Sequence, residues 1–148
     1  MASLVLTAPA RDAMKTILVV DDDSGIRSLL RRVLESLGHR VQEAAGALEA
    51  LDVLNRDRFD LALCDVIMPG HDGVWLAGQI LARHPGLPVA LATGLVEMDP
   101  TVTLRPGVVG YLVKPFRHQA VASLLDSAFE GPPPAAAGEI DLSALDAI

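Results

Sequence analysis

The chain has 148 residues, 51% of them hydrophobic, and a formal net charge of −7 at pH 7. This length suits one domain with a buried core, and the apolar runs are as long as strands rather than membrane spans, so no membrane insertion is expected. The negative charge argues against direct binding of nucleic acid, and the one cysteine, Cys64, excludes an internal disulfide and fits the reducing cytoplasm.

Strand-like and helix-like segments alternate along the central part of the chain. Apolar periodicity, with turn residues between the segments, predicts strands over 16–21, 40–44, 60–65, 88–93 and 108–113. The same pattern predicts helices over 24–37, 46–56, 72–83 and 116–129. Strands separated by helices predict an α/β fold with a doubly wound, five-stranded parallel sheet. The nearly continuous apolar strands agree with this, because parallel strands are covered on both faces.

Domain boundaries follow from the same pattern. We expect residues 1–14 to form a flexible leader and residues 15–130 to form a single domain. Residues 131–148 are expected to be a Pro/Ala-rich linker followed by a short acidic tail without Lys or Arg. Apolar residues in the tail have the loose spacing of an amphipathic turn: Ile140, Leu142, Leu145 and Ile148. The tail is either a disordered end or a segment that docks on the domain itself or on a partner.

Polar side chains end four of the predicted strands. Asp21 and Asp22 end the first strand, and Asp65, Thr93 and Lys114 end or follow the third, fourth and fifth strands. Open α/β sheets bind ligands at their carboxyl edge, so we expect these side chains to gather at one site. An isolated Asp at a strand end is most often a helix cap, as expected for Asp23 or Ser24, but burying three unpaired acids would be costly.

Such a set of side chains suits a divalent cation together with a phosphoryl group. Two carboxylates about 4 Å apart repel each other by roughly 4 kcal/mol at an effective dielectric constant near 20, so the cluster requires a compensating charge. Mg²⁺ prefers carboxylate, water and phosphate oxygens. With the metal in place, an aspartate can attack phosphorus and form an acyl phosphate. Lys114 and the Thr93 hydroxyl are suited to contact the phosphoryl oxygens.

Four motifs carry a resemblance to a known family. They are VVDD over 19–22, DVIMPGHDG over 65–73, ATG over 92–94 and GYLVKPF over 110–116. In this order and with these spacings, over about residues 15–130, the chain resembles the response-regulator receiver domain of bacterial two-component signalling. The resemblance implies a flavodoxin-like sheet with the strand order 2-1-3-4-5.

The resemblance also implies roles for the acidic residues. It implies that Asp65 is phosphorylated by a sensor histidine kinase or by a histidine phosphotransfer protein. It implies Mg²⁺ as the cofactor, with Asp22, Asp65 and the backbone carbonyl of Ile67 as direct ligands. Asp21 would assist through water.

A conformational switch is implied as well. Thr93 and Lys114 would contact the phosphoryl group, and Tyr111 would be the aromatic residue whose rotamer follows Thr93. The peptide bond between Lys114 and Pro115 would be cis, which proline makes tolerable.

The chain departs from the family pattern where the fourth helix is expected. Residues 94–107 contain Pro100 and Pro106, with three β-branched residues between them. Proline interrupts helix interiors, and Thr and Val are mediocre helix formers. We therefore expect this helix to be short, frayed or rearranged, which puts a standard output dimer in doubt.

The implied function is a cytoplasmic phosphoacceptor switch, with no enzymatic activity beyond Mg-dependent self-phosphorylation and autodephosphorylation. No helix-turn-helix with a basic recognition helix is evident, so output is expected through contact with a downstream protein, with a homodimer left open. The chain could stand alone or derive from a hybrid kinase or a longer regulator. The alternative is a phosphohydrolase that passes through an aspartyl phosphate. Enzymes resembling the haloacid dehalogenases require a second acid two residues after the nucleophile. This chain has Ile67 at that position, which weighs against the alternative.

The cysteine and the histidines are not expected to form a site. Cys64 should lie in the core, where a free cysteine behaves as a small hydrophobe. The histidines lack metal-ligand spacing, so we expect them in solvated loops and at helix ends; they are His39, His71, His84 and His118.

Overall fold

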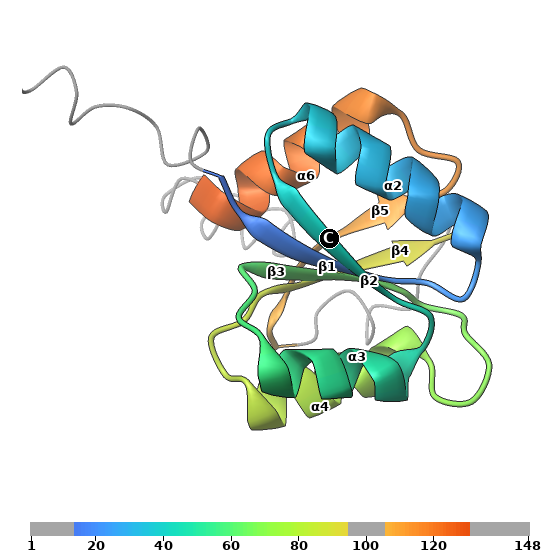
Figure 1. The fold of residues 1–148 in the computed structure, drawn as a ribbon, viewed down its shortest axis with the longest axis vertical. Coiled ribbons are helices and arrows are strands. Elements are labelled where there is room, and N and C mark those ends of the chain that lie inside the picture. The colour runs from blue at the N-terminus through green and yellow to red at the C-terminus, as the bar shows by residue number, and fades with distance from the viewer. Residues whose placement is uncertain (1–13, 95–105, 131–148) are drawn as a thin grey trace, which may run out of the picture.

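Five parallel strands form a single sheet. The computed structural model describes residues 14–94 and 106–130, and the sheet has the order β2-β1-β3-β4-β5. Helices α2 and α6 cover one face of the sheet, and α3 and α4 cover the other (Figure 1). The doubly wound parallel sheet expected from the sequence, with the strand order implied by the resemblance, is confirmed.

The elements lie within about two residues of their predicted positions. The strands are β1 Thr16–Val20, β2 Arg40–Ala44, β3 Leu61–Asp65, β4 Val89–Thr93 and β5 Val108–Val113. The helices are α2 Ser24–Ser36, α3 Ala47–Arg56, α4 Gly73–Arg83 and α6 His118–Glu130. In the part of the chain that the structure describes, no helix is both long and apolar enough to cross a bilayer.

Some expectations fall outside the described residues. The short or irregular fourth helix concerns mainly residues 95–105, the leader was expected over 1–14, of which 1–13 are not described, and the tail covers 131–148. These expectations stay predictions.

Side-chain caps explain where two of the helices begin. The Asp23 carboxylate accepts hydrogen bonds from the backbone N–H groups of Gly25 and Ile26, at 2.8 and 3.2 Å. Asp72 caps α4 by accepting from the Trp75 N–H at 2.8 Å. These bonds satisfy N–H groups that the first turn of a helix leaves without partners. Of the two caps considered for the first helix, Asp23 is the one used.

The central strands separate the core into two layers. Ile17 and Val19 of β1 belong to the cluster under α2 and α6, whereas Leu18 and Val20 belong to the cluster under α3 and α4. All of these side chains are buried. Side chains alternate between the faces of a strand, so a sheet covered on both faces needs apolar residues at every position of its central strands.

Cys64 occupies the expected core position. It is fully buried in the layer under α3 and α4. Burial, and then the charge of the neighbouring Asp65, raises the pKa of its thiol to about 12. The thiol therefore stays protonated at neutral pH, which makes it a poor nucleophile.

His39 does not lie in solvent, as the sequence suggested, but is buried between β1 and α6. Its Nδ1 accepts a hydrogen bond from the Lys15 backbone N–H at 3.0 Å, and its ring centroid lies 6.0 Å from that of Phe129. Burial, and then the nearby charge of Lys15, lowers the pKa of His39 below its ordinary value. The sequence prediction was wrong because the covering residues come from the distant C-terminal helix.

This burial predicts a loss of stability in mild acid. The unfolded chain binds a proton at His39 more readily than the folded chain, so the free energy of unfolding should fall as the pH drops below about 6.5. Protonation of Nδ1 would also remove the acceptor for the Lys15 N–H. Urea unfolding at a series of pH values should show a smaller decline for His39→Gln than for the parent chain. Equal declines would contradict the prediction.

Candidate functional site

Three aspartates come together at the carboxyl edge of the sheet. Asp21 and Asp22 directly follow β1, and Asp65 is the last residue of the neighbouring β3. One carboxylate oxygen from each residue lies within 4.8 Å of the others. Asp21 and Asp65 are buried, at 1% and 8% exposure, whereas Asp22 is exposed to solvent. Two carboxylates are thus held inside the protein, and a third lies at the opening.

Lys114 supplies a positive charge to this cluster. It follows β5, and its Nζ lies 3.0 Å from Asp21 Oδ2 and 3.2 Å from Asp65 Oδ1. Its backbone N–H donates to the Thr93 carbonyl at 2.7 Å, and the peptide bond to Pro115 is cis, as the resemblance implied. Asp21, Asp22, Asp65 and Lys114 are called the acidic site below.

The electrostatics of the acidic site show that one lysine does not balance its charge. Burial, and then the charge of Asp21, raises the pKa of Asp65, although Lys114 and the Ile67 backbone N–H act in the opposite direction. Burial by itself would lower the pKa of Lys114, but its hydrogen bond to Asp21 and the charges of Asp21 and Asp65 raise it. The site therefore holds a charged lysine and at least one carboxylate whose ionisation is disfavoured. An added cation would relieve this imbalance.

The donor set fits Mg²⁺. The candidate ligands are carboxylate oxygens, which this hard cation prefers, and the exposure of Asp22 leaves room for the water and phosphate oxygens that complete an octahedral shell. The grouping also places a potential nucleophile, the Asp65 carboxylate, beside an ammonium group.

Arg27 fixes the loop that carries Asp21 and Asp22. Its Nη1 donates to the Asp21 carbonyl at 2.7 Å, and its Nε donates to Glu43 Oε1 on β2 at 2.9 Å. The Asp23 N–H donates to Asp21 Oδ1 at 2.9 Å. Arg27 lies outside the motifs that the sequence pointed to. Its position was a signal that could have been used. A cation is unfavourable near the N-terminus of a helix, so an arginine there indicates that a specific partner holds it.

Of the other residues proposed from the sequence, two lie beside this cluster and one does not. Thr93 is the last residue of β4 and is fully buried. The Ile67 side chain is 62% exposed, and its backbone N–H donates to the Asp65 carboxylate. Tyr111 is 47% exposed on β5, where it pairs with Leu91 rather than with Thr93. The structure thus places Thr93 and Ile67 beside the acidic site and Tyr111 on a solvent-facing part of the edge strand.

Gly73, at the start of α4, allows the helix to approach the end of β3. A Cβ atom at this position would lie 2.2 Å from the Asp65 carbonyl oxygen and 3.0 Å from the Val66 Cα. The Gly73 N–H donates to the Val66 carbonyl at 2.8 Å, so the contact also orients the backbone around Asp65. In the sequence this glycine stood out only as the last residue of the motif over 65–73.

Gly73→Ala should therefore destabilise the protein by about 1–3 kcal/mol, the usual cost of overpacking. The atoms that must move are backbone atoms, which cannot rotate away. Gly78→Ala is a matched control on the same helix. A Cβ there meets nothing within 4 Å, so the change should raise the free energy of unfolding by about 1 kcal/mol. Urea denaturation measures both effects, and similar values for the two variants would contradict this account.

Comparison with known proteins shows which family of proteins the chain is similar to. The family profile described as "Response regulator receiver domain" matches residues 17–126. The response regulator protein FleR of Pseudomonas aeruginosa is 42% identical over 110 residues. This match covers 74% of the present chain but only 23% of FleR.

Two solved structures have similar folds. TrrA from Thermotoga maritima, in complex with Mg²⁺ and BeF, is 29% identical with a TM-score of 0.72, covering 78% of this chain and 99% of that one. The receiver domain of a sensor histidine kinase from Pseudomonas aeruginosa, with a magnesium ion coordinated in its active-site cleft, is 29% identical with a TM-score of 0.71. It covers 80% of this chain and 99% of its own.

Proposed function

The chain belongs to the response-regulator receiver family, and on that premise we propose that Asp65 is its phosphoacceptor in a Mg-dependent reaction. The donor would be a phosphohistidine on a sensor histidine kinase or on a histidine phosphotransfer protein. The observation that carries the proposal is the acidic site, where Lys114 Nζ lies within 3.2 Å of both Asp21 and Asp65.

In the proposed step, an oxygen of the Asp65 carboxylate attacks the phosphorus of the donor. A new P–O bond forms while the P–N bond to the donor imidazole breaks, and the leaving nitrogen keeps the bonding electrons and takes up a proton. Lys114 then pairs with a phosphoryl oxygen instead of the free carboxylate, and Thr93 donates its hydroxyl hydrogen to another oxygen.

Mg²⁺, when bound, would supply positive charge to the carboxylates and to the phosphoryl oxygens. Asp22, Asp65 and the Ile67 carbonyl would hold it directly, and Asp21 through water. Both similar structures described above were solved with magnesium, in one case together with BeF, which supports Mg²⁺ as the cation.

Phosphorylation would act on the rest of the protein through Thr93 and Tyr111. Movement of the Thr93 hydroxyl toward the phosphoryl group would vacate space that the exposed Tyr111 ring can fill, which is a two-state packing change. Reversing a 1:99 population to 99:1 requires that phosphorylation favour the active state by about 5.5 kcal/mol. Output would then pass by protein contact to a downstream target in the cytoplasm.

A titration with beryllofluoride and Mg²⁺, followed by NMR, tests the proposal. Amide signals of Asp22, Ile67, Thr93 and Lys114 should shift with saturation, and Tyr111 should follow with the same affinity. Mg²⁺ alone should shift mainly the signals of the acidic residues. Beryllofluoride shifts that persist in Asp65→Ala would contradict Asp65 as the acceptor. Turnover of a generic phosphate ester, lost in the same variant, would instead support the phosphohydrolase alternative.

A further inference from the structure

We propose that the acidic C-terminal segment, residues 139–148, binds within the same molecule to a groove at the amino edge of the sheet. This edge lies at the opposite end of the strands from the acidic site, so the interaction is separate from the proposed phosphorylation. The groove is lined by Thr16, Arg40, Val41, Gln42, Asp57 and Arg58 and has a volume of about 380 Å³. It is called the amino-edge groove below.

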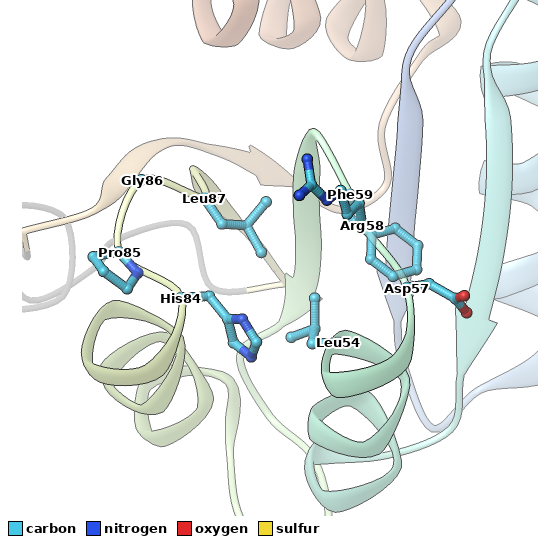
Figure 2. A pocket seen from close by; sticks show the side chains of 8 residues that line it. All are labelled: Leu54, Asp57, Arg58, Phe59, His84, Pro85, Gly86 and Leu87. Atoms are coloured by element: carbon cyan, nitrogen blue, oxygen red, sulfur yellow. The ribbon is translucent and has the colours of Figure 1, made fainter.

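A second pocket of about 320 Å³ continues the amino-edge groove between the ends of α3 and α4. Asp57 and Arg58 line both cavities, which makes them one surface. Figure 2 shows Leu54, Leu87 and the His84 ring turned toward the space between the helix ends, with the Asp57 side chain directed away from them. The surface therefore offers a mixed recess, in which apolar side chains such as Leu54 and Leu87 lie beside the charged Asp57 and Arg58.

The charge of this edge is opposite to that of the whole chain. The net charge of the chain is −7, yet basic residues collect where the strands begin and the helices α3 and α4 end. They are Lys15, Arg40, Arg56, Arg58 and Arg83. Two acids also lie here, so the basic residues are in excess: Asp57 lines both cavities, and the Asp60 carboxylate already accepts the Thr16 N–H at 2.8 Å. An anionic ligand is favoured at such a surface.

His84 adds a polar atom that lacks a partner. Its Nε2 is buried and has no hydrogen-bond partner among the residues that the structure describes. Buried polar groups are nearly always hydrogen-bonded, because an unmet donor or acceptor is costly. This nitrogen is shielded from solvent, so a carboxylate in the pocket would accept a hydrogen bond from Nε2–H once the His84 ring turns toward the opening.

The C-terminal segment has the chemistry that this surface requires. It contains Glu139, Asp141 and Asp146 and no Lys or Arg. It also carries four apolar residues that can pack against Leu54 and Leu87, namely Ile140, Leu142, Leu145 and Ile148. Carboxylates can pair with Arg40 and Arg58 while the apolar side chains enter the recess.

The segment also begins close enough to reach the groove. Helix α6 ends at Glu130, and the ring of Phe129 has Lys15 Nζ 5.1 Å from its centroid. Lys15 is joined to Arg40, a groove residue, by a backbone hydrogen bond of 2.8 Å. Residues 131–138 can span at most about 26–29 Å, which is ample for this distance. A linker this short gives a tethered segment an effective concentration on the order of millimolar, so weak contacts suffice for binding in cis.

A paramagnetic label on the segment tests the proposal directly. Ser143→Cys can be spin-labelled selectively, because Cys64 is fully buried and its thiol is protonated. In ¹H–¹⁵N spectra recorded without Mg²⁺ or phosphodonor, the amide signals of Arg40–Gln42, Arg58 and Leu87 should lose most of their intensity. Signals at 109–113 on β5 and at 22–25 in the acidic loop should keep theirs. Loss centred on either of those regions, or no localised loss, would overturn the proposal.

Charge variants provide matched controls. Arg40→Glu with Arg58→Glu should abolish the localised signal loss, whereas Arg32→Glu, an exposed position on α2, should leave it intact. Should the double variant fold poorly, Glu139→Lys with Asp141→Lys changes only the segment and should have the same effect. Signal loss that survives both sets of charge changes would contradict the proposed pairing.

A mixed sample distinguishes the segment's own domain from a second copy. Spin-labelled protein without ¹⁵N enrichment is mixed with ¹⁵N-enriched protein that carries no spin label. Binding in cis predicts no broadening in this mixture, while broadening of the groove signals would show that the segment binds another molecule and would overturn the proposal. Because no phosphodonor is present, failure here leaves the proposed function of Asp65 untouched.

Discussion

Replacing Asp65 with asparagine should reduce phosphorylation by acetyl phosphate or by a phosphohistidine donor to the level of a control without donor. The amide cannot act as the nucleophile that forms an acyl phosphate. Intact-protein mass spectrometry in the presence of Mg²⁺ measures the outcome as the mass of one added phosphoryl group. Persisting phosphorylation of the variant would show that another residue accepts the group.

Asp72→Asn is a matched control for this experiment. Asp72 is exposed and caps α4, and asparagine caps helices about as well as aspartate, so phosphorylation should persist. The Asp65→Asn variant itself should not be less stable than the parent in the absence of Mg²⁺. Burial and the charge of Asp21 raise the pKa of Asp65, which means that the folded protein disfavours the charged carboxylate. A urea unfolding curve of Asp65→Asn that matches the parent's would show that the loss of phosphorylation does not come from unfolding.

Replacing Lys114 with methionine should lower the free energy of unfolding by about 3 kcal/mol, as expected when one partner of a buried ion pair is removed. The Lys114 side chain is 20% exposed, and its partners Asp21 and Asp65 are 2% and 10% exposed, so solvent screens the remaining charges weakly. Urea denaturation without Mg²⁺ measures this loss. Mg²⁺ should restore part of the stability, since a ligand that binds only the folded state stabilises it.

Lys114→Arg separates the charge from the shape of the side chain. The positive charge is kept, so most of the stability should remain. The planar guanidinium cannot place a single donor where the ammonium places one. Binding of beryllofluoride should therefore weaken even though the protein remains stable. If Lys114→Met were as stable as the parent and gained nothing from Mg²⁺, the three acids would not behave as a repulsive cluster.

Local sequence patterns predicted the elements of this fold well. Apolar runs that end at polar residues located the strands, and Asp23 was one of the two caps expected for the first helix. The positions of Asp65 and Lys114 at strand ends followed from the same runs. These features were predictable because hydrogen bonding and hydrophobic periodicity within one element depend on residues that are close in sequence.

The order of the strands did not follow from the periodicity; the resemblance to receiver domains supplied it. No local pattern states which strand lies beside which, since the connections allow several arrangements. The contact of Lys114 with Asp21 joins residues 93 positions apart, and it exists because β1 and β5 end at the same edge.

The sequence by itself therefore determined where the strands end and which chemical groups stand at those ends. The tertiary structure alone decided that the helix beginning at Gly73 packs against the Asp65 carbonyl, that Arg27 holds the Asp21 loop, and that His39 is buried. Each of these depends on which distant surface covers a residue. Burial and close approach are properties of packing between elements, whereas helix and strand periodicity belong to each element alone.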